Sequence, residues 1–357
     1  MAKLTRPDLD DLPSYVPGRS PADLARELGL AEAVKLASNE VPYGPLPGVL
    51  DAIATAAAQS HRYPDMGVLA LRETLSARYG VTLDRIVTGC GSVALLELLA
   101  KAATRPGDEI VYSWRSFEAY PIVAAGAGVR SVRVANTDEH GHDLDAMAAA
   151  VTDATRIVIV CNPNNPTGTT VRRDGLTRFL DAVPDDVLVV LDEAYREFVT
   201  DDAVPDGLVE YADRPNVVVL RTMSKAWGLA GLRCGWLVAA PDVADAVRKV
   251  LTPFSTNMLA QAAGIAALDA EAEMRRRVER VIADRDALTP RVRELVPGVP
   301  DSQANFVWLP LADPTGFAKA CESRGVIVRP FPEGVRVTIG TPSENEAFLA
   351  AAEAALG

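Results

Sequence analysis

The feature that most constrains the fold is a series of short, continuously apolar segments that alternate with helical patterns between about residues 84 and 240. Continuous apolar runs are typical of strands covered on both faces, since a strand with one solvated face alternates apolar and polar residues. Helical stretches such as 93–104 and 172–183 separate the runs, which favours parallel strands joined by crossovers. The expected strands are 85–89, 109–113, 131–135, 156–162, 187–192, 216–222 and 235–239. They predict an α/β fold built on one large, mostly parallel sheet.

The pattern changes near residue 241. A long helical run from about residue 257 to 295 leads into a short tail in which strands and helices alternate. A chain of 357 residues exceeds the size of one ordinary core, so two domains are expected. We interpret the tail as a smaller α+β domain.

Composition argues against several classes of protein. The net charge is −12 and no Lys/Arg-rich run is present, so the field of the protein opposes nucleic acid. No apolar run approaches the roughly 20 residues of a membrane helix, and the N-terminus lacks an apolar signal core. The four cysteines are far apart, and a turn explains His140 and His142 better than a metal site does. We therefore expect a cytoplasmic protein without a metal, a membrane anchor or a nucleic-acid partner.

The segment SKAWGLAGLRCGW at 224–236 places Lys225 just after a predicted strand, where open α/β sheets keep their ligands. Thr222, Ser224 and Arg233 lie in the same short stretch. Two hydroxyls and a guanidinium are suited to binding a phosphate. The amine of Lys225 can then form a Schiff base with an aldehyde attached to that phosphate. A solvated surface lysine is the commoner meaning of a single lysine, but these neighbours favour the functional interpretation.

Two other predicted strands end in polar motifs, CNPNNPTG at 161–168 and LDEAYREF at 191–198. Asp192 is suited to holding a proton on a pyridine nitrogen, and Tyr195 and Asn165 are suited to binding a phenolic oxygen on the same ring. Acids at strand ends more often cap helices, and Asn-Pro steps more often form turns. Neither structural role excludes the functional one.

The segment TGCGSVALLELL at 88–99 predicts a strand, a glycine turn and a helix start, an arrangement that exposes backbone N–H groups to an anion beside Ser92. It also matches the loose GxGxxG/A pattern of dinucleotide-binding enzymes. That pattern requires an acidic residue at the end of the second strand. Asp108 and Glu109 stand at its beginning instead, which weakens the dinucleotide interpretation.

Six motifs occur in one order along the chain: SNExPxGP (38–45), RYPD (62–65), CNPNNPTG, DEAY, SKAxGLAGLRxG and RVTIGT (336–341). Together they resemble the fold-type I (class II) aminotransferases of the histidinol-phosphate aminotransferase branch, which depend on pyridoxal 5′-phosphate (PLP). The resemblance runs from YVPG (15–18) to the last helix. It implies a seven-stranded, mostly parallel sheet in a PLP-binding domain at 36–245 and a small α+β domain at 246–357. Residues 1–35 would form an arm or lid that contributes to the small domain.

Further motifs narrow the resemblance. GCGSVAL, WRSFEAYP (114–121) and SQANFVWLPL (302–311) are similar to segments of the actinobacterial aromatic amino acid (phenylalanine) aminotransferases. Typical histidinol-phosphate aminotransferases have an Asp-Glu pair after the Gly-Ser of the phosphate turn. This chain has Val93 and Ala94 there, which lowers the weight of that specificity.

The resemblance implies a role for each matching residue. Lys225 is the Schiff-base lysine and general base, Asp192 pairs with the pyridine nitrogen, and Tyr195 and Asn165 bind the phenolic oxygen. Phe117 stacks on the ring. The phosphate is held by Ser92, Val93 (through its backbone N–H), Thr222, Ser224 and Arg233.

The resemblance extends to the substrate and to a partner. Arg336 is expected to bind the substrate carboxylate, with Asn39 and the lid-like Tyr15 nearby. The arginine comparable to Arg329 contacts the distal phosphate of the substrate in histidinol-phosphate enzymes. Tyr63 is expected to reach the cofactor of a neighbouring subunit, which implies a homodimer.

These roles imply the transfer of an amino group from an aromatic amino acid to 2-oxoglutarate in two half-reactions. Any one of Trp114, Phe117, Tyr120 and Trp227 is more often a core residue, but together they favour an apolar pocket for the side chain. The main alternative is histidinol phosphate as donor. Remote alternatives are a decarboxylase of the threonine-phosphate type and a PLP-sensing regulator without enzymatic activity.

Overall fold

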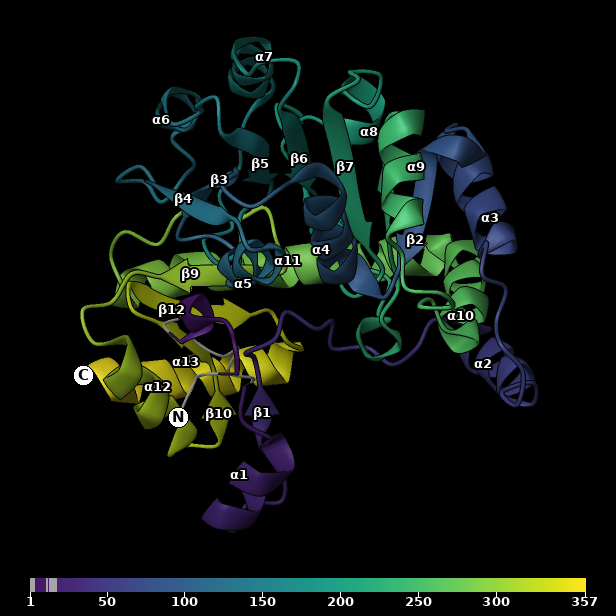
Figure 1. Cartoon of the computed structure of the whole chain (residues 1–357). Helices are drawn as coiled ribbons and strands as arrows, with labels where there is room; N and C mark the ends of the chain where they lie inside the picture. Colours follow the sequence, from purple (N-terminus) through teal and green to yellow (C-terminus); the bar gives the residue numbers. More distant parts are fainter. Residues whose placement is uncertain (1–3, 11, 13–17) are drawn as a thin grey trace.

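The computed structural model describes residues 4–10, 12 and 18–357. Its largest element is a seven-stranded sheet in the order β2-β8-β7-β6-β5-β3-β4, in which β8 alone runs antiparallel to its neighbours (Figure 1). The strands are β2 (Ile86–Gly89), β3 (Glu109–Trp114), β4 (Arg130–Ala135), β5 (Thr155–Cys161), β6 (Leu188–Asp192), β7 (Val217–Thr222) and β8 (Gly235–Val238). The predicted α/β fold with a large, mostly parallel sheet is confirmed.

Helices cover both faces of this sheet, which explains the continuous apolar runs. In β5, Ile157 and Ile159 pack into one hydrophobic cluster, whereas Val158 and Val160 pack into another. Successive side chains of a strand point to opposite faces, so both faces must be apolar. One face is covered by α4 (Gly91–Ala103), α5 (Ala119–Ala127) and α9 (Pro241–Lys249), and the other by α6 (Leu144–Ala149), α7 (Arg173–Ala182) and α8 (Gly207–Glu210).

The edge strand β4 departs from the predicted pattern. Its residues are exposed or half-buried, and Ser131 and Arg133 alternate with Val132 and Val134. The strand pairs only with β3, so its free edge and part of its surface remain in solvent. The alternation of polar and apolar residues follows from that position.

The C-terminal part of the chain forms a second, smaller sheet with its own helices. A three-stranded antiparallel sheet is formed by β9 (Phe306–Leu309), β11 (Arg329–Phe331) and β12 (Gly334–Thr338), and it lies with α12 (Pro314–Glu322) and α13 (Pro342–Leu356) (Figure 1). The short strand β1 (Val34–Lys35) pairs in parallel with β10 (Val326–Ile327). The other helices are α1 (Pro21–Leu28), α2 (Val49–Ala57), α3 (Leu69–Tyr79) and the 3₁₀ turns η1 (Pro7–Leu9), η2 (Leu83–Arg85), η3 (Arg196–Phe198) and η4 (Ala230–Leu232). The domain boundaries at residues 35 and 245 stay a prediction.

The long helical run predicted for residues 257–295 is two helices. α10 (Met258–Asp269) ends at Ala270, and α11 (Glu271–Leu295) begins directly after it. Glu271 and Glu273 lie in the first turn of α11, where carboxylates interact favourably with the helix dipole. The acidic residues mark a helix start that apolar periodicity did not reveal.

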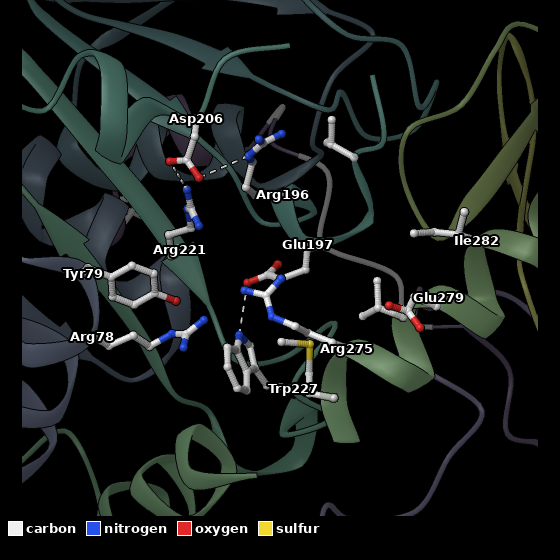
Figure 2. Close-up of a pocket in the computed structure, with 13 residues that line it drawn as sticks. Arg78, Tyr79, Arg196, Glu197, Asp206, Arg221, Trp227, Arg275, Glu279 and Ile282 are labelled. Atoms are coloured by element: carbon white, nitrogen blue, oxygen red, sulfur yellow. Dashed lines mark hydrogen bonds and ion pairs between the residues drawn. The ribbon is translucent and has the colours of Figure 1, made fainter. Parts of the chain in front are cut away.

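A buried ionic network joins the ends of β6 and β7. The guanidinium of Arg221 donates to Glu193 at 2.6 Å. It also donates to Asp206 at 2.8 Å, and Asp206 accepts from Arg196 (Figure 2). The Arg221 and Glu193 side chains are only 5% and 3% exposed. Removing one partner of such a pair leaves a buried charge uncompensated, so the network fixes the two strand ends relative to each other.

We predict that Arg221→Met costs about 3 kcal/mol of stability, because Glu193 would keep its charge in the interior without its cation. Urea unfolding followed by circular dichroism measures the change. Arg214→Met is the matched control, since Arg214 pairs with Asp181 at the surface and such pairs contribute about 1 kcal/mol or less. Equal losses in the two variants would contradict the prediction.

Candidate active site

A pocket lies at the carboxyl end of the large sheet. Cys161, Asp192 and Thr222 are the last residues of β5, β6 and β7, and all three line it. Parallel strands end at a common edge, so residues that are distant in sequence meet there. Of the residues predicted for the site, the pocket is lined by Asn39, Ser92, Val93, Phe117, Asn165, Asp192, Tyr195, Thr222, Ser224, Lys225, Arg233 and Arg336.

The amine of Lys225 is held in this pocket by the segment that follows β1. Its Nζ donates to the carbonyl oxygen of Ser38 at 3.1 Å. Burial and the positive charges of Arg336 and Arg233, against a raising effect of Glu40, together lower the pKa of Lys225 to about 7. A large fraction of the amine is therefore neutral near pH 7, and a neutral amine is the nucleophilic form.

Asp192 is a buried carboxylate with one oxygen satisfied. Its Oδ2 accepts from the Tyr120 hydroxyl at 2.8 Å, whereas no donor among the described residues contacts its buried Oδ1. Burial, opposed in part by the Tyr120 hydroxyl and the backbone N–H of Ala194, raises the pKa of Asp192 to about 6. A buried acceptor without a donor is costly, so Oδ1 is suited to an N–H supplied by a ligand.

A hydrogen-bonded group faces the pocket beside Asp192. Asn39 Nδ2 donates to the Tyr195 hydroxyl at 2.9 Å, and burial raises the pKa of that tyrosine. Arg336 donates to Asn165 Oδ1 and to the carbonyl oxygen of Ala37. Four segments that are separate in sequence thus meet through these hydrogen bonds.

The start of α4 forms an anion site with the segment after β7. Cys90, the N-cap residue of this 13-residue helix, makes no side-chain capping bond, and Ser92 and Val93 of the first turn line the pocket. Arg233 Nη1 donates to Ser224 Oγ at 3.1 Å, and Thr222 Oγ1 donates to the same oxygen at 3.0 Å. These residues gather a guanidinium, two hydroxyls and a helix N-terminus.

Two glycines allow this close assembly. A Cβ on Gly91 would lie 2.3 Å from Arg233 Nη2, and a Cβ on Gly235 would lie 2.5 Å from the backbone nitrogen of Ser92. Gly91 also has φ +82°, a region that favours glycine. Arg233 has φ 61° and Asn39 has φ 55°, so two pocket residues hold left-handed backbone conformations. Such strain clusters at functional sites.

These features fit PLP. The helix N-terminus, Ser92, Thr222, Ser224 and Arg233 suit its phosphate. The unsatisfied Oδ1 of Asp192 suits a protonated ring nitrogen, and the neutral amine of Lys225 suits its aldehyde. The individual roles assigned from the sequence remain predictions.

Three predicted residues do not line the pocket. Tyr63 is 81% exposed and stacks on Phe254, with ring centroids 4.6 Å apart. Arg329 pairs with Glu118 at 2.7 Å beside the pocket. Tyr15 lies outside the described residues.

The prediction that Trp114, Phe117, Tyr120 and Trp227 together form an aromatic pocket is wrong in its composition. Of these four residues, Phe117 alone lines the cavity. Trp114, the last residue of β3, packs against a hydrophobic cluster of the core. Tyr120 is fully buried, and its hydroxyl contacts Asp192. Trp227 faces a second cavity of about 290 Å³ on the side of α11, where its indole Nε1 donates to Glu197 at 3.1 Å (Figure 2).

The hydrogen bond between Trp227 and Glu197 connects the segment that carries Lys225 to the segment that carries Tyr195. Trp227 lies two residues after Lys225, and Glu197 lies two residues after Tyr195. Burial raises the pKa of Glu197, while the charge of Arg221 lowers it. The second cavity is therefore lined by residues that position the segments of the active site, and Lys225 and Asp192 do not line it.

Sequence reasoning also missed partners that act on the predicted residues. Tyr120 donates to Asp192, Ser38 accepts from Lys225, and Thr338 Oγ1 accepts from the backbone N–H of Asn39 at 2.9 Å. Only Thr338 carried a usable signal: it lies two residues after Arg336 on a strand and therefore shares its face.

No cluster of three or more His, Cys, Asp or Glu side chains among the described residues is arranged to hold a metal ion. No helix in this part of the chain has the length and apolar character needed to span a membrane.

Comparison with known proteins identifies close relatives. The family model for aminotransferase class I and II matches residues 31–351. Aromatic amino acid aminotransferases of Streptomyces avermitilis and Thermobifida fusca are each 53% identical, over 98% and 97% of this chain and 96% of each relative. Among solved structures, a histidinol-phosphate aminotransferase from Sinorhizobium meliloti in complex with PLP is 28% identical, with a TM-score of 0.86, and covers 100% of this chain and 98% of that chain.

We predict that the reactivity of Lys225 in the cofactor-free protein rises with pH through about 7, because protonation of its amine is lost there. Acylation by an amine-directed reagent at a series of pH values, with the modified lysine identified by mass spectrometry, measures this profile. Arg336→Gln removes a positive charge that lowers the pKa, so its profile is expected to shift to higher pH. A rise that begins only near pH 10 in the unaltered protein would contradict the prediction.

Proposed function

The chain belongs to the class I and II aminotransferase family and is a PLP-dependent aminotransferase, and from this premise we propose that it transfers the amino group of an aromatic amino acid to 2-oxoglutarate. The observation that carries the chemistry is one pocket that holds both Lys225, with its lowered pKa, and Asp192, with its unsatisfied buried oxygen. The aromatic specificity is supported by relatives of that name, which match nearly the full length.

When bound, PLP supplies an aldehyde carbon and an electron-withdrawing ring. Asp192 would keep a proton on the ring nitrogen through Oδ1, while Tyr120 holds Oδ2 in place. Lys225 Nζ, with a pKa near 7, takes up and returns a proton near neutral pH, which is the requirement for a general base and acid.

Arg336 is placed to bind a substrate carboxylate. Arg336 is 7% exposed, and its guanidinium lies over the rings of Phe306 and Phe331 at 5.6 Å from each centroid. A buried guanidinium in an apolar frame binds a carboxylate with two aligned donors. Both half-reactions use substrates with a carboxylate at this position, so Arg336 serves both.

A single-turnover screen tests the proposal. Enzyme loaded with PLP is mixed with phenylalanine, tyrosine, tryptophan or histidinol phosphate without an amino acceptor, and the keto product released per enzyme is measured. We expect the aromatic amino acids to react fastest, each giving one equivalent. Lys225→Ala is expected to slow the reaction about 10²–10⁴-fold because the proton-transferring amine is lost.

Two results would contradict this assignment. A faster reaction with histidinol phosphate than with any aromatic amino acid would favour the alternative donor. Release of carbon dioxide from threonine phosphate without a keto product would favour decarboxylation.

We further propose that the enzyme is a cytoplasmic homodimer in which Tyr63 completes the site of the neighbouring subunit. Tyr63, Met66 and Leu69 are exposed on adjoining segments, together with Phe254, against which Tyr63 stacks. Exposed apolar groups gathered in this way are typical of protein interfaces. Cys90, Cys161, Cys234 and Cys321 are free thiols, in keeping with a reducing compartment.

Tyr63→Phe is expected to weaken PLP binding about tenfold if its hydroxyl reaches the phosphate of a partner's cofactor, since a hydrogen bond to a charged group contributes about 1.5 kcal/mol or more. PLP affinity is measured by equilibrium dialysis, and the oligomeric state by analytical ultracentrifugation. Tyr43→Phe, at a tyrosine outside the pocket, is the control. A monomer that binds PLP as tightly as before would exclude the dimeric site.

A further inference from the structure

The backbone of Asn39 is held from two sides by the small antiparallel sheet. Its N–H donates to Thr338 Oγ1 at 2.9 Å, and its carbonyl oxygen accepts from Asn305 Nδ2 at 3.1 Å. Thr338 ends β12 and is paired with Phe306, which directly follows Asn305 and begins β9. These two buried contacts hold Asn39 in its left-handed conformation, with φ 55°.

The hydroxyl of Thr338 also determines which way the side-chain amide of Asn39 faces. A hydroxyl has one proton to donate, and Thr338 donates it to Asn39 Oδ1 at 3.1 Å. In the reversed orientation Nδ2 would face Oγ1, and the hydroxyl proton would lose its acceptor. A buried donor without an acceptor is costly, so Oδ1 is held toward Thr338 and Nδ2 points away from it.

The orientation of this amide is passed on to Tyr195. Asn39 Nδ2 donates to the Tyr195 hydroxyl at 2.9 Å, so the tyrosine oxygen is the acceptor and its own proton points elsewhere. Burial raises the pKa of Tyr195, which keeps that proton on the oxygen. The ring packs edge-on against Phe306, with centroids 5.1 Å apart, and Tyr195 lines the pocket. Its proton is therefore available to a ligand there.

The direction of this hydrogen bond matters to the cofactor. Tyr195 is predicted to bind the phenolic oxygen of PLP, which carries negative charge beside the nitrogen that PLP shares with Lys225. A hydrogen bond donated to this oxygen draws charge from it and weakens its hold on the proton of that nitrogen. The pKa of the Schiff base is then lower than it would be beside a hydroxyl that donates elsewhere.

We propose that Thr338 is a positioning residue, which through Asn39 orients the Tyr195 hydroxyl as a donor to the phenolic oxygen of PLP. The inference rests on the PLP-dependent activity and on the role predicted for Tyr195, and it is independent of which amino acid is the donor. It gives a function to a buried residue that does not line the pocket.

Thr338→Val tests the proposal, because valine has the shape of threonine but no hydroxyl. Asn39 Oδ1 then lacks its donor, and the amide is free to turn and to accept the Tyr195 proton. Absorbance of enzyme-bound PLP, titrated with pH in the absence of substrate, measures the pKa of the Schiff base. We expect this pKa to rise by about half to one pH unit. Thr338→Ser keeps the hydroxyl and is expected to restore the value of the unaltered enzyme.

A double variant shows whether Thr338 acts through Tyr195. Tyr195→Phe removes the donated bond, so the pKa of the Schiff base is expected to rise by about one pH unit, since a hydrogen bond to a charged group changes an equilibrium roughly tenfold or more. Thr338→Val in the Tyr195→Phe background is expected to add nothing, because the proton that it misdirects is absent.

Thr177→Val is the matched control, since the Thr177 hydroxyl contacts the Tyr211 hydroxyl at 2.8 Å outside the pocket, and its pKa profile is expected to be unchanged. Thermal unfolding and PLP content establish that each variant is folded and loaded. The other ionisable groups that act on Lys225 and Tyr195 are the same in every variant: Lys35, Glu40, Cys161, Asp192, Arg233 and Arg336.

An unchanged pKa in folded Thr338→Val, an equal rise in Thr338→Ser, or a further rise in the double variant would overturn the proposal. So would an unchanged pKa in Tyr195→Phe, because Tyr195 would then not donate to the phenolic oxygen. None of these measurements uses a substrate. Failure of the proposed function is therefore distinct, since it would appear as a preference of the unaltered enzyme for histidinol phosphate over phenylalanine.

Discussion

Burial of two oppositely ionisable groups at the ends of parallel strands is the constraint on which the site depends. Loss of water lowers the pKa of Lys225 to about 7 and raises that of Asp192 to about 6, so both groups approach neutrality. A protein without a ligand gains nothing from this arrangement, because Asp192 Oδ1 has no donor among the described residues. PLP carries the complementary groups, an aldehyde for the amine and a protonated nitrogen for the carboxylate. The same burial that makes these two groups costly in the absence of a ligand therefore favours binding of the cofactor.

The rest of the molecule keeps these two groups in position. Near the strand ends, Arg221 and Glu193 form a buried ion pair. Trp227 donates a hydrogen bond to Glu197 at the wall of the second cavity (Figure 2). On the opposite side, the small antiparallel sheet brings Arg336 to the pocket. The polar interior is costly in desolvation, yet each of these contacts restricts a loop that would otherwise be free to move. Rigidity on both sides is what allows a buried amine to meet a bound aldehyde reproducibly.

Much of this was predictable from the sequence, for reasons that differ by residue. Continuous apolar runs located six strands of the large sheet, because burial on both faces leaves a strong signal. The seventh, β4, was located although its exposed position gives it alternating polar and apolar residues. Strand ends then indicated Asp192 and Lys225, since chemistry in such folds gathers there. Side-chain partnerships were not predictable: nothing near Tyr120 or Trp227 in the sequence indicates that one binds Asp192 and the other Glu197. Contacts of this kind join positions separated by many residues and depend on packing, which no local pattern encodes.

The pairing of β1 with β10 has a consequence for how the enzyme is made. Leu36 donates its N–H to Ile327, Thr338 donates to Leu36, and the adjoining Ser38 and Asn39 form one wall of the pocket. During synthesis on the ribosome, residues near 36 emerge long before residues near 330. The large sheet can assemble first, as domains generally fold in units. The hydrogen bonds that fix the wall beside the amine of Lys225 can then form only after residues near 338 have emerged.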